Sequence, residues 1–281
     1  RFGSDLVNHK TYVLAGDGCL MEGISQEALA LAGHLKLSNL IVIWDDNGIT
    51  IDGKVGMSDS TDQLARFAAS GWNVTRVDGH NPQEIAGALA TAQSADRPSF
   101  IAARTIIGYG SPNKAGTNGV HGSPLGADEI AKVREKLGWS HAPFVVPDDI
   151  LKAWRAAGEL GASARKDWQG RLVSSPHKAE FTRITEGKLP AGLADAIASY
   201  KKALAASPPA LATRNASQNA LDVINPIVSE AIGGSADLTG SNNTKSKDLK
   251  PFTSGDYAGR YVYYGIREHG MAAAMNGLAL H

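Results

Sequence analysis

Short apolar runs that alternate with helical patterns constrain the fold of this chain more than any other feature. Over the first hundred or so residues they predict strands at 12–15, 40–44, 72–77 and 99–104 and helices at 23–35 and 82–94. Strands that alternate with helices along a chain form a parallel sheet, because each helix returns the chain to the same end of the sheet. The predicted fold class is therefore α/β with a parallel sheet.

A helical stretch separates this part from a second one. Between about residues 147 and 210 the sequence is rich in Ala, Lys and Arg and is broken by prolines at Pro176, Pro190 and Pro208-Pro209. A second α/β pattern then begins near Thr213.

In this second pattern we expect one strand to end at Gly233 and another to cover Tyr261–Ile266. The predicted organisation has three parts: a first α/β domain over 1–178, a helical connector over 179–212 and the start of a second α/β domain over 213–281.

Composition limits the possible partners. Lys plus Arg and Asp plus Glu both number 28, so no basic surplus favours nucleic acid or an anionic membrane, and no apolar stretch is long enough to span a membrane. The single cysteine, Cys19, suits a reducing compartment, and we expect it to be a small packed side chain in a cytoplasmic protein. The chain starts at Arg1 and ends at His281 within a helical pattern, so we expect it to be part of a longer protein.

Two polar side chains follow neighbouring predicted strands. Asp17 lies between Gly16 and Gly18 just after the strand 12–15, and Asn47 follows the strand 40–44. The carboxyl ends of parallel strands meet at the edge where open α/β sheets bind ligands. A carboxylate and an amide oxygen there suit Mg²⁺ or Ca²⁺, and the glycines with the next helix's amides suit a diphosphate. The alternative, in which Asp17 only serves a strand-to-helix turn, stays open.

Longer stretches carry a family resemblance. The segment "GDGCLMEGISQEALALAGHLKLSNLIVIWDDNGITIDG" resembles transketolase, and "TIIGYGSPNKAGT", "HGSPLG", "ASQNAL", "GGSADLTGSN" and "YYGIREHGM" continue the likeness in the same order. The resemblance implies a thiamine diphosphate-binding fold with parts of two domains. It also implies that the chain lacks the start of the diphosphate-binding domain, the end of the pyrimidine-binding domain and the C-terminal domain.

The resemblance assigns roles around the metal and the diphosphate. Asp17, Asn47 and the backbone carbonyl of Ile49 match metal ligands for Mg²⁺ or Ca²⁺. Gly16 and Gly18 match positions beside the diphosphate of the cofactor. Glu22 matches a glutamate that links the two active sites of a dimer.

Two more acidic residues match positions at the cofactor's rings. Glu268 matches the glutamate that hydrogen-bonds the aminopyrimidine ring, and Asp237 matches a carboxylate near the thiazolium. By sharing a proton with a ring nitrogen, such a carboxyl promotes removal of the thiazolium proton. Without the surrounding motif, Glu268 is better explained as a helix-start glutamate that complements the helix dipole, and the motif reverses that preference.

Three positions match residues that handle the sugar phosphate. Arg214 and Ser241 match a phosphate clamp, in which a guanidinium fork and a hydroxyl donate hydrogen bonds. His121 matches a histidine close to the reacting carbons. Taken singly, each has an ordinary alternative: a surface charge, a loop serine and a turn histidine.

The function implied is that of a transketolase, which moves a two-carbon ketol unit from xylulose 5-phosphate to ribose 5-phosphate or erythrose 4-phosphate through a carbanion of thiamine diphosphate. We expect a homodimer with active sites at its interface, in the pentose phosphate pathway or the Calvin cycle. Two alternatives stay open: dihydroxyacetone synthase, which uses formaldehyde as acceptor, and a catalytically silent cofactor-binding protein.

Overall fold

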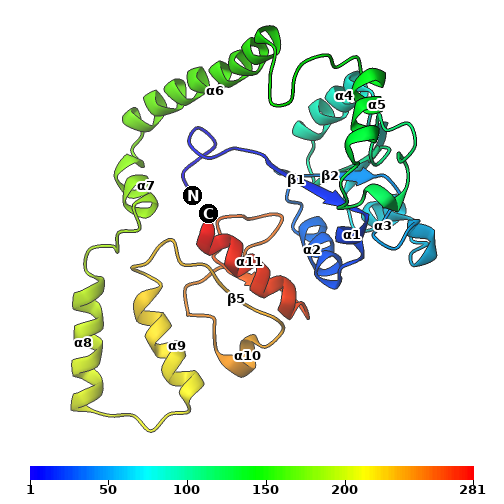
Figure 1. The fold of residues 1–281 in the computed structure, drawn as a ribbon. Coiled ribbons are helices and arrows are strands. Elements are labelled where there is room, and N and C mark those ends of the chain that lie inside the picture. Colours follow the sequence, from blue (N-terminus) through cyan, green and yellow to red (C-terminus); the bar gives the residue numbers. More distant parts are fainter. The chain divides into compact units, whose positions relative to one another are not determined.

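The computed structural model describes residues 1–281 and divides them into two compact units (Figure 1). The first unit comprises Asn8–Gln169. The second comprises Arg1–Val7 together with Gly170–His281. No helix is both long and apolar enough to cross a membrane.

A four-stranded parallel sheet forms the centre of the first unit. Its strands, in spatial order, are β1 (Thr11–Gly16), β2 (Leu40–Asp46), β4 (Ser99–Arg104) and β3 (Asn73–Asp78). All neighbouring strands pair in parallel, which confirms the predicted α/β class. Gly16 at the end of β1 pairs with Asp45 near the end of β2, so the residues that follow the two strands emerge side by side.

Helices connect and cover these strands. Those of the first unit are α1 (Asp17–Met21), α2 (Gly23–His34), α3 (Gln63–Ala69), α4 (Pro82–Gln93) and α5 (Ala127–Lys136), with 3-10 turns η1 (Val55–Met57) and η2 (Asn118–Val120). The long helix α6 (Asp148–Ser174) begins in the first unit and its last residues, from Gly170, belong to the second. Helix α4 begins as predicted, because the Asn81 side chain accepts hydrogen bonds from the amides of Gln83 and Glu84.

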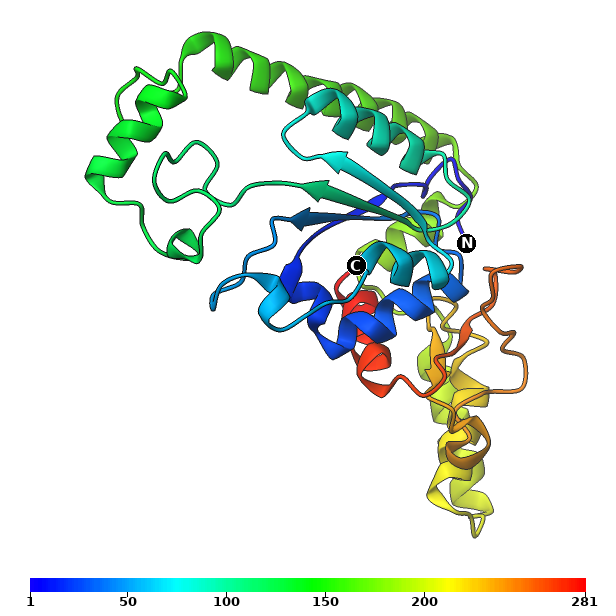
Figure 2. The same ribbon diagram turned by 90° about the vertical axis from the view of Figure 1, so that its right-hand side faces the viewer.

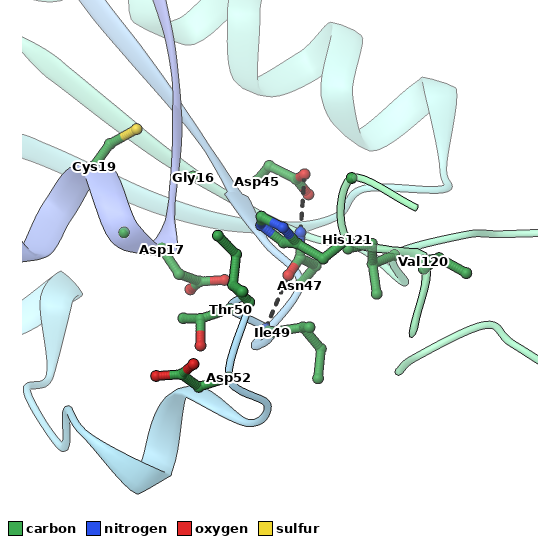
Figure 3. A pocket seen from close by; sticks show the side chains of 14 residues that line it. Gly16, Asp17, Cys19, Asp45, Asn47, Ile49, Thr50, Asp52, Val120 and His121 are labelled. Carbon is green, nitrogen blue, oxygen red and sulfur yellow. Dashed lines mark hydrogen bonds between the residues drawn. The ribbon is translucent and has the colours of Figure 1, made fainter. Parts of the chain in front are cut away.

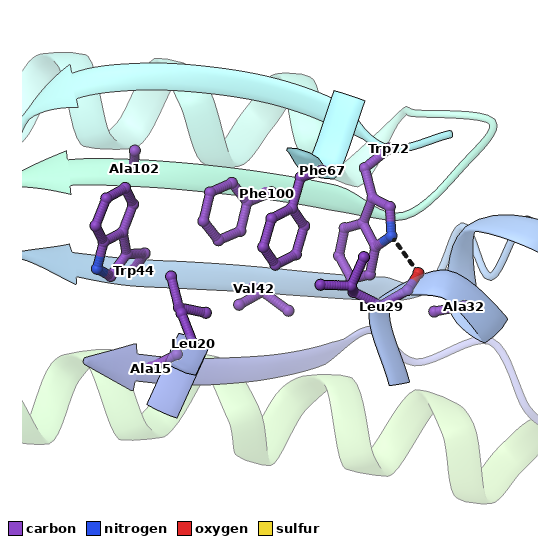
Figure 4. Close-up of a cluster of buried hydrophobic side chains, with 10 residues drawn as sticks. All are labelled: Ala15, Leu20, Leu29, Ala32, Val42, Trp44, Phe67, Trp72, Phe100 and Ala102. Atoms are coloured by element: carbon purple, nitrogen blue, oxygen red, sulfur yellow. Dashed lines mark hydrogen bonds between the residues drawn. The ribbon is translucent and has the colours of Figure 1, made fainter. Parts of the chain in front are cut away.

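Two hydrophobic clusters cover the two faces of the sheet, with α2 on one side and α4 on the other (Figure 2). On the α2 side, Phe100 is fully buried and its ring stacks on Phe67 at a centroid distance of 3.7 Å. Trp44 and Trp72 lie toward the two ends of this cluster (Figure 4). On the α4 side, Ile41 and other strand residues pack against the helix. Burial on both faces explains the near-continuous apolar runs of the central strands.

The second unit is mainly helical with a small sheet. Its elements are α7 (Lys178–Thr185), α8 (Leu193–Ala206), α9 (Thr213–Ile224), β5 (Gly233–Ser235), α10 (Thr239–Asn242), β6 (Tyr261–Tyr263) and α11 (Glu268–Leu280). Helices α8 and α9 lie side by side (Figure 1). The strands β5 and β6 pair in parallel.

Both strand predictions for this unit need correction. The strand expected to end at Gly233 begins there. The next residue, Gly234, must be glycine for the two strands to pair closely, since a Cβ on it would lie 2.5 Å from the Val262 carbonyl oxygen. The strand expected over Tyr261–Ile266 ends at Tyr263, and Gly265 (φ 66°) then turns the chain into α11.

Polar contacts hold the segments of the second unit together. The Arg260 guanidinium donates to the carbonyl oxygens of Asn225, Val228 and Ala231 at 2.9–3.1 Å. The fully buried Tyr261 places its hydroxyl within hydrogen-bond distance of the hydroxyls of two threonines, Thr239 and Thr244. This unit therefore depends on hydrogen bonds where the first depends on apolar packing.

Candidate active site

Asp17 lies at the point where β1 ends and α1 begins. Its side chain is buried, and both carboxylate oxygens accept hydrogen bonds: Oδ1 from the Trp44 indole Nε1 at 3.2 Å and Oδ2 from the Gly48 amide at 3.0 Å. Gly48 has φ 72°, a conformation that glycine adopts without strain. The carboxylate is therefore fixed by two donors from β2 and the turn that follows it.

Asn47 opens this turn. Its Oδ1 accepts from the Ile49 amide at 2.9 Å, and its Nδ2 donates to Asp45 Oδ2 at 3.1 Å. The other Asp45 oxygen accepts from the Thr105 hydroxyl, which follows β4. The turn is thus anchored to the ends of two strands.

These elements line one pocket of about 760 Å³. Its lining residues are Gly16, Asp17, Gly18, Cys19, Asp45, Asn47, Ile49, Thr50, Ile51, Asp52, Ile107, Val120, His121 and Gly122. Figure 3 shows the His121 ring near Asn47, above the turn that carries Ile49. The predicted proximity of Asp17 and Asn47 is confirmed, and His121 joins them from the distant loop after η2.

The electrostatics of the pocket suit a cation. Burial raises the pKa of the Asp17 carboxyl, and the negative charges of Asp46 and Asp45 raise it further, against the lowering effect of its two hydrogen bonds. A divalent cation would relieve this repulsion, and the carboxylate, amide and carbonyl oxygens of Asp17, Asn47 and Ile49 are the hard ligands that Mg²⁺ and Ca²⁺ prefer. The donor set therefore fits such a metal.

The glycines beside Asp17 leave room for a further ligand. A Cβ on Gly16 or Gly18 would meet no atom within 4 Å, although both residues line the pocket. This open space at the start of α1 is compatible with a diphosphate close to the backbone.

The neighbouring Asp46 has a different role. It is buried, and its carboxylate pairs with Arg104 at 2.9 Å and Arg76 at 3.2 Å. Arg104 also donates to the Asp46 carbonyl oxygen, and its guanidinium lies against Gly48. These ion pairs fix the carboxyl end of β2, next to the turn that carries Asn47.

A buried glutamate organises the segment that leads to His121. The Glu129 carboxylate on α5 accepts from the Ser111 hydroxyl and from the amide and side chain of Asn113. These hydrogen bonds lower the pKa of Glu129 to about 2. The sequence "SPNK" is therefore tied to α5 by a carboxylate that stays ionised.

Sequence reasoning missed several pocket residues and misplaced one. Asp45 and Asp52 line the pocket within the quoted "DDNGITID", but only Asn47 and Ile49 were singled out there. Cys19, expected to be packed, is exposed and lines the pocket. The expectation was wrong because α1 is one short helix that buries Leu20 and Asp17 and turns its other face outward.

The remaining predicted residues lie outside this pocket. Glu22 is exposed between α1 and α2. In the second unit, Glu268 is the first residue of α11, and Asp237 and Ser241 lie in the segment after β5. Asp237 has φ 60°, a left-handed conformation that is uncommon for a residue with a side chain.

Arg214 lies on α9, which is tied to the segment that carries Ser241. The Asn243 side chain donates to Asn215 Oδ1 at 2.7 Å, and the Gln218 side chain donates to the Lys245 carbonyl at 3.0 Å. The structure thus joins the elements of Arg214 and Ser241 within the second unit.

Comparison with known families matches two successive parts of the chain. Residues 1–190 match "Transketolase, thiamine diphosphate binding domain", and residues 209–281 match "Transketolase, pyrimidine binding domain". The chain belongs to the transketolase family. The fold class and the resemblance predicted from sequence are thereby confirmed.

Individual relatives and solved structures support the same family assignment. Transketolases from Cereibacter sphaeroides and Rhodobacter capsulatus are 58% and 55% identical to this chain over its full length. A crystal structure of transketolase from Pichia stipitis, determined with xylulose 5-phosphate, matches 97% of the chain with a TM-score of 0.89 and 38% identity. Transketolase from Leishmania mexicana matches with a TM-score of 0.87 and 39% identity.

The chain spans less than half of these proteins. It covers 43% and 42% of the two bacterial relatives and 42% and 41% of the two solved structures.

Proposed function

We propose that this chain provides the metal- and diphosphate-binding part and the first segment of the pyrimidine-binding part of a transketolase. The enzyme transfers a two-carbon ketol unit from a ketose phosphate such as xylulose 5-phosphate to an aldose phosphate, ribose 5-phosphate or erythrose 4-phosphate. The observation that supports this most strongly is the pocket that gathers Asp17 from the start of α1, Asn47 and Ile49 from the turn after β2, and His121 from the loop after η2.

The first unit would hold the cofactor. Asp17, Asn47 and the Ile49 carbonyl would bind Mg²⁺ or Ca²⁺, and Gly16 and Gly18 would leave space for the diphosphate. Thiamine diphosphate, when bound, supplies an electron sink for the two-carbon unit. The imidazole of His121, at the same pocket, would donate to or accept from sugar hydroxyls.

The second unit would supply the groups for proton handling and phosphate binding. Glu268 would share a proton with a ring nitrogen of the cofactor, and Asp237 would face its second ring. Arg214 and Ser241 would bind the phosphate of the sugar, and the hydrogen bonds that join the elements carrying them support this pairing.

We further propose that the enzyme is a cytoplasmic homodimer. One cofactor must reach both Asp17 and Glu268, which belong to different units, and a two-fold dimer makes two equal sites from such halves. Glu22 would contribute to the link between them. Mixed dimers of Asp17→Ala and Glu268→Gln chains should then recover roughly a quarter of wild-type activity, since half the dimers are mixed and each holds one intact site. No recovery, with subunit exchange proven by mass spectrometry, would contradict the dimer.

The test of the activity uses protein expressed from its complete coding sequence, with xylulose 5-phosphate as donor. Ribose 5-phosphate and formaldehyde are offered in turn as acceptors. We expect turnover with ribose 5-phosphate. Turnover with formaldehyde alone would indicate dihydroxyacetone synthase, and cofactor binding without turnover would indicate a silent protein.

A further inference from the structure

Asp17 is held by a donor that no sequence motif predicts. The Trp44 indole Nε1 donates to Asp17 Oδ1 at 3.2 Å, and both side chains are buried, with exposed fractions of 8% and 7%. The two residues lie 27 positions apart in the sequence and meet because β1 and β2 are neighbours in the sheet.

Packing fixes the direction of this indole N–H. The Trp44 ring is nearly parallel to Phe100, with 20° between the planes and 5.8 Å between the centroids, and it belongs to the same cluster as Ala15 and Leu20. Figure 4 shows the ring at one end of that cluster. A tightly packed ring has few alternative rotamers, so its N–H points to one place.

The donor is also neutral, and the adjacent Asp46 shows why this matters. Asp46 is paired with two arginines, Arg76 and Arg104, whose positive charges offset its own. An indole N–H orients a carboxylate and leaves its negative charge intact. The hydrogen-bond donors to Asp17, an indole and a backbone amide, carry no positive charge that would compete with a cation, whereas the charge of Asp46 is already offset by two arginines.

We propose that Trp44 is a positioning residue that orients the Asp17 carboxylate for cation binding, and that the emission of its indole reports occupation of the site. The proposal rests on the proposed function, because it requires a divalent cation at Asp17. Partners that orient metal ligands typically contribute 10- to 100-fold to metal affinity. A cation held by the carboxylate would change the electric field at the Trp44 indole, whose Nε1 lies 3.2 Å from Asp17 Oδ1.

Trp72 provides a matched control. It belongs to the same cluster, is buried to a similar degree at 5% exposed, and donates its indole N–H to the Leu29 carbonyl at 2.8 Å (Figure 4). Trp44→Phe and Trp72→Phe each keep an aromatic ring and remove one indole hydrogen bond from the same core. They differ in the acceptor of the lost hydrogen bond, which is Asp17 for Trp44 and the Leu29 carbonyl for Trp72.

The experiment uses protein that is expressed from its complete coding sequence and stripped of metal, and titrates it with Mg²⁺ in the presence of thiamine diphosphate. Calorimetry measures affinity, and tryptophan emission is recorded in the same titration. We expect Trp44→Phe to weaken cation affinity at least about 10-fold and to abolish the emission change. Trp72→Phe should keep the affinity within about twofold and retain the emission change.

Three outcomes decide the proposal. Wild-type affinity in both variants would overturn the proposal while leaving the metal site in place, and an equal loss of affinity in both would overturn it by assigning the effect to core packing. Absence of Mg²⁺ binding in the wild type would overturn the proposed function as well. If Trp44→Phe does not fold, a tryptophan isostere with sulfur in place of the indole N–H tests the same bond with the ring shape retained.

Discussion

In the first unit, Asp17 and the turn that carries Asn47 stand on a sheet packed on both faces, whereas in the second unit the segments that carry Arg214 and Ser241 are fastened by polar contacts. Most of the buried apolar side chains belong to the first unit. The proposed metal side of the site therefore takes its geometry from hydrophobic packing. The proposed phosphate side takes its geometry from hydrogen bonds.

The tryptophans allow this difference to be measured. All five of them, Trp44, Trp72, Trp139, Trp154 and Trp168, lie in the first unit. Tryptophan emission therefore follows the unfolding of the first unit, and amide hydrogen exchange can follow the second.

The largest effect is expected from Phe100→Ala. Phe100 is fully buried against Phe67 and Trp44, so its truncation should destabilise the first unit by about 3–5 kcal/mol. Urea unfolding followed by tryptophan emission measures this loss. Phe144→Ala is the control, because Phe144 is fully exposed in the same unit. A loss below about 1.5 kcal/mol for Phe100→Ala would contradict the importance of packing there.

A smaller effect is expected from Arg260→Met in the second unit. Its three carbonyl acceptors would lose a charged donor, which should cost about 2 kcal/mol and speed amide exchange at residues 225–231 roughly thirty-fold. The tryptophan-detected midpoint should stay unchanged. Lys201→Met, which removes an exposed positive charge from α8, serves as the control. A shift of the tryptophan-detected midpoint would show that the two units do not unfold separately.

The smallest expected effect is a change in the pKa values of two carboxylates, Glu129 and Glu180. The pKa of Glu129 is lowered to about 2 by the neutral donors Ser111 and Asn113, and the pKa of Glu180 is lowered to about 2 by its bonds to Arg183 and then Ser229. Since both pKa values lie below the ordinary 4.5, each carboxylate stabilises its unit above about pH 4.5, and this stabilisation is lost as the pH falls toward 2.

The salt concentration should affect the pKa values of these two carboxylates differently. Raising the salt concentration to about 0.5 M screens the Arg183 charge, so the pKa of Glu180 should rise while that of Glu129 stays nearly constant. Carbon NMR of the glutamate carboxyls in an acid titration measures both values. Equal movement of the two pKa values with salt would remove the distinction between neutral and charged anchoring.

The parallel strands and the meeting of Asp17 with Asn47 could be predicted from sequence, because the ends of neighbouring parallel strands share an edge. The bond between Trp44 and Asp17 could not, since it depends on the orientation of a packed ring. Cys19 was misplaced because a single-turn helix has no periodicity to detect. Gly233 was expected to end a strand, but it begins β5, and the next residue, Gly234, is the glycine that the close pairing of β5 with β6 requires.

The central claim, that Asp17 holds a divalent cation bridged to thiamine diphosphate, is tested most directly by calorimetric titration of the cofactor in the presence of Mg²⁺. Asp17→Ala is compared with wild type and with Asp128→Ala, which removes an exposed carboxylate from α5 of the same unit. We expect Asp17→Ala to abolish measurable binding, because the cation loses its charged ligand, while Asp128→Ala binds like wild type. Wild-type affinity in Asp17→Ala would contradict the assignment.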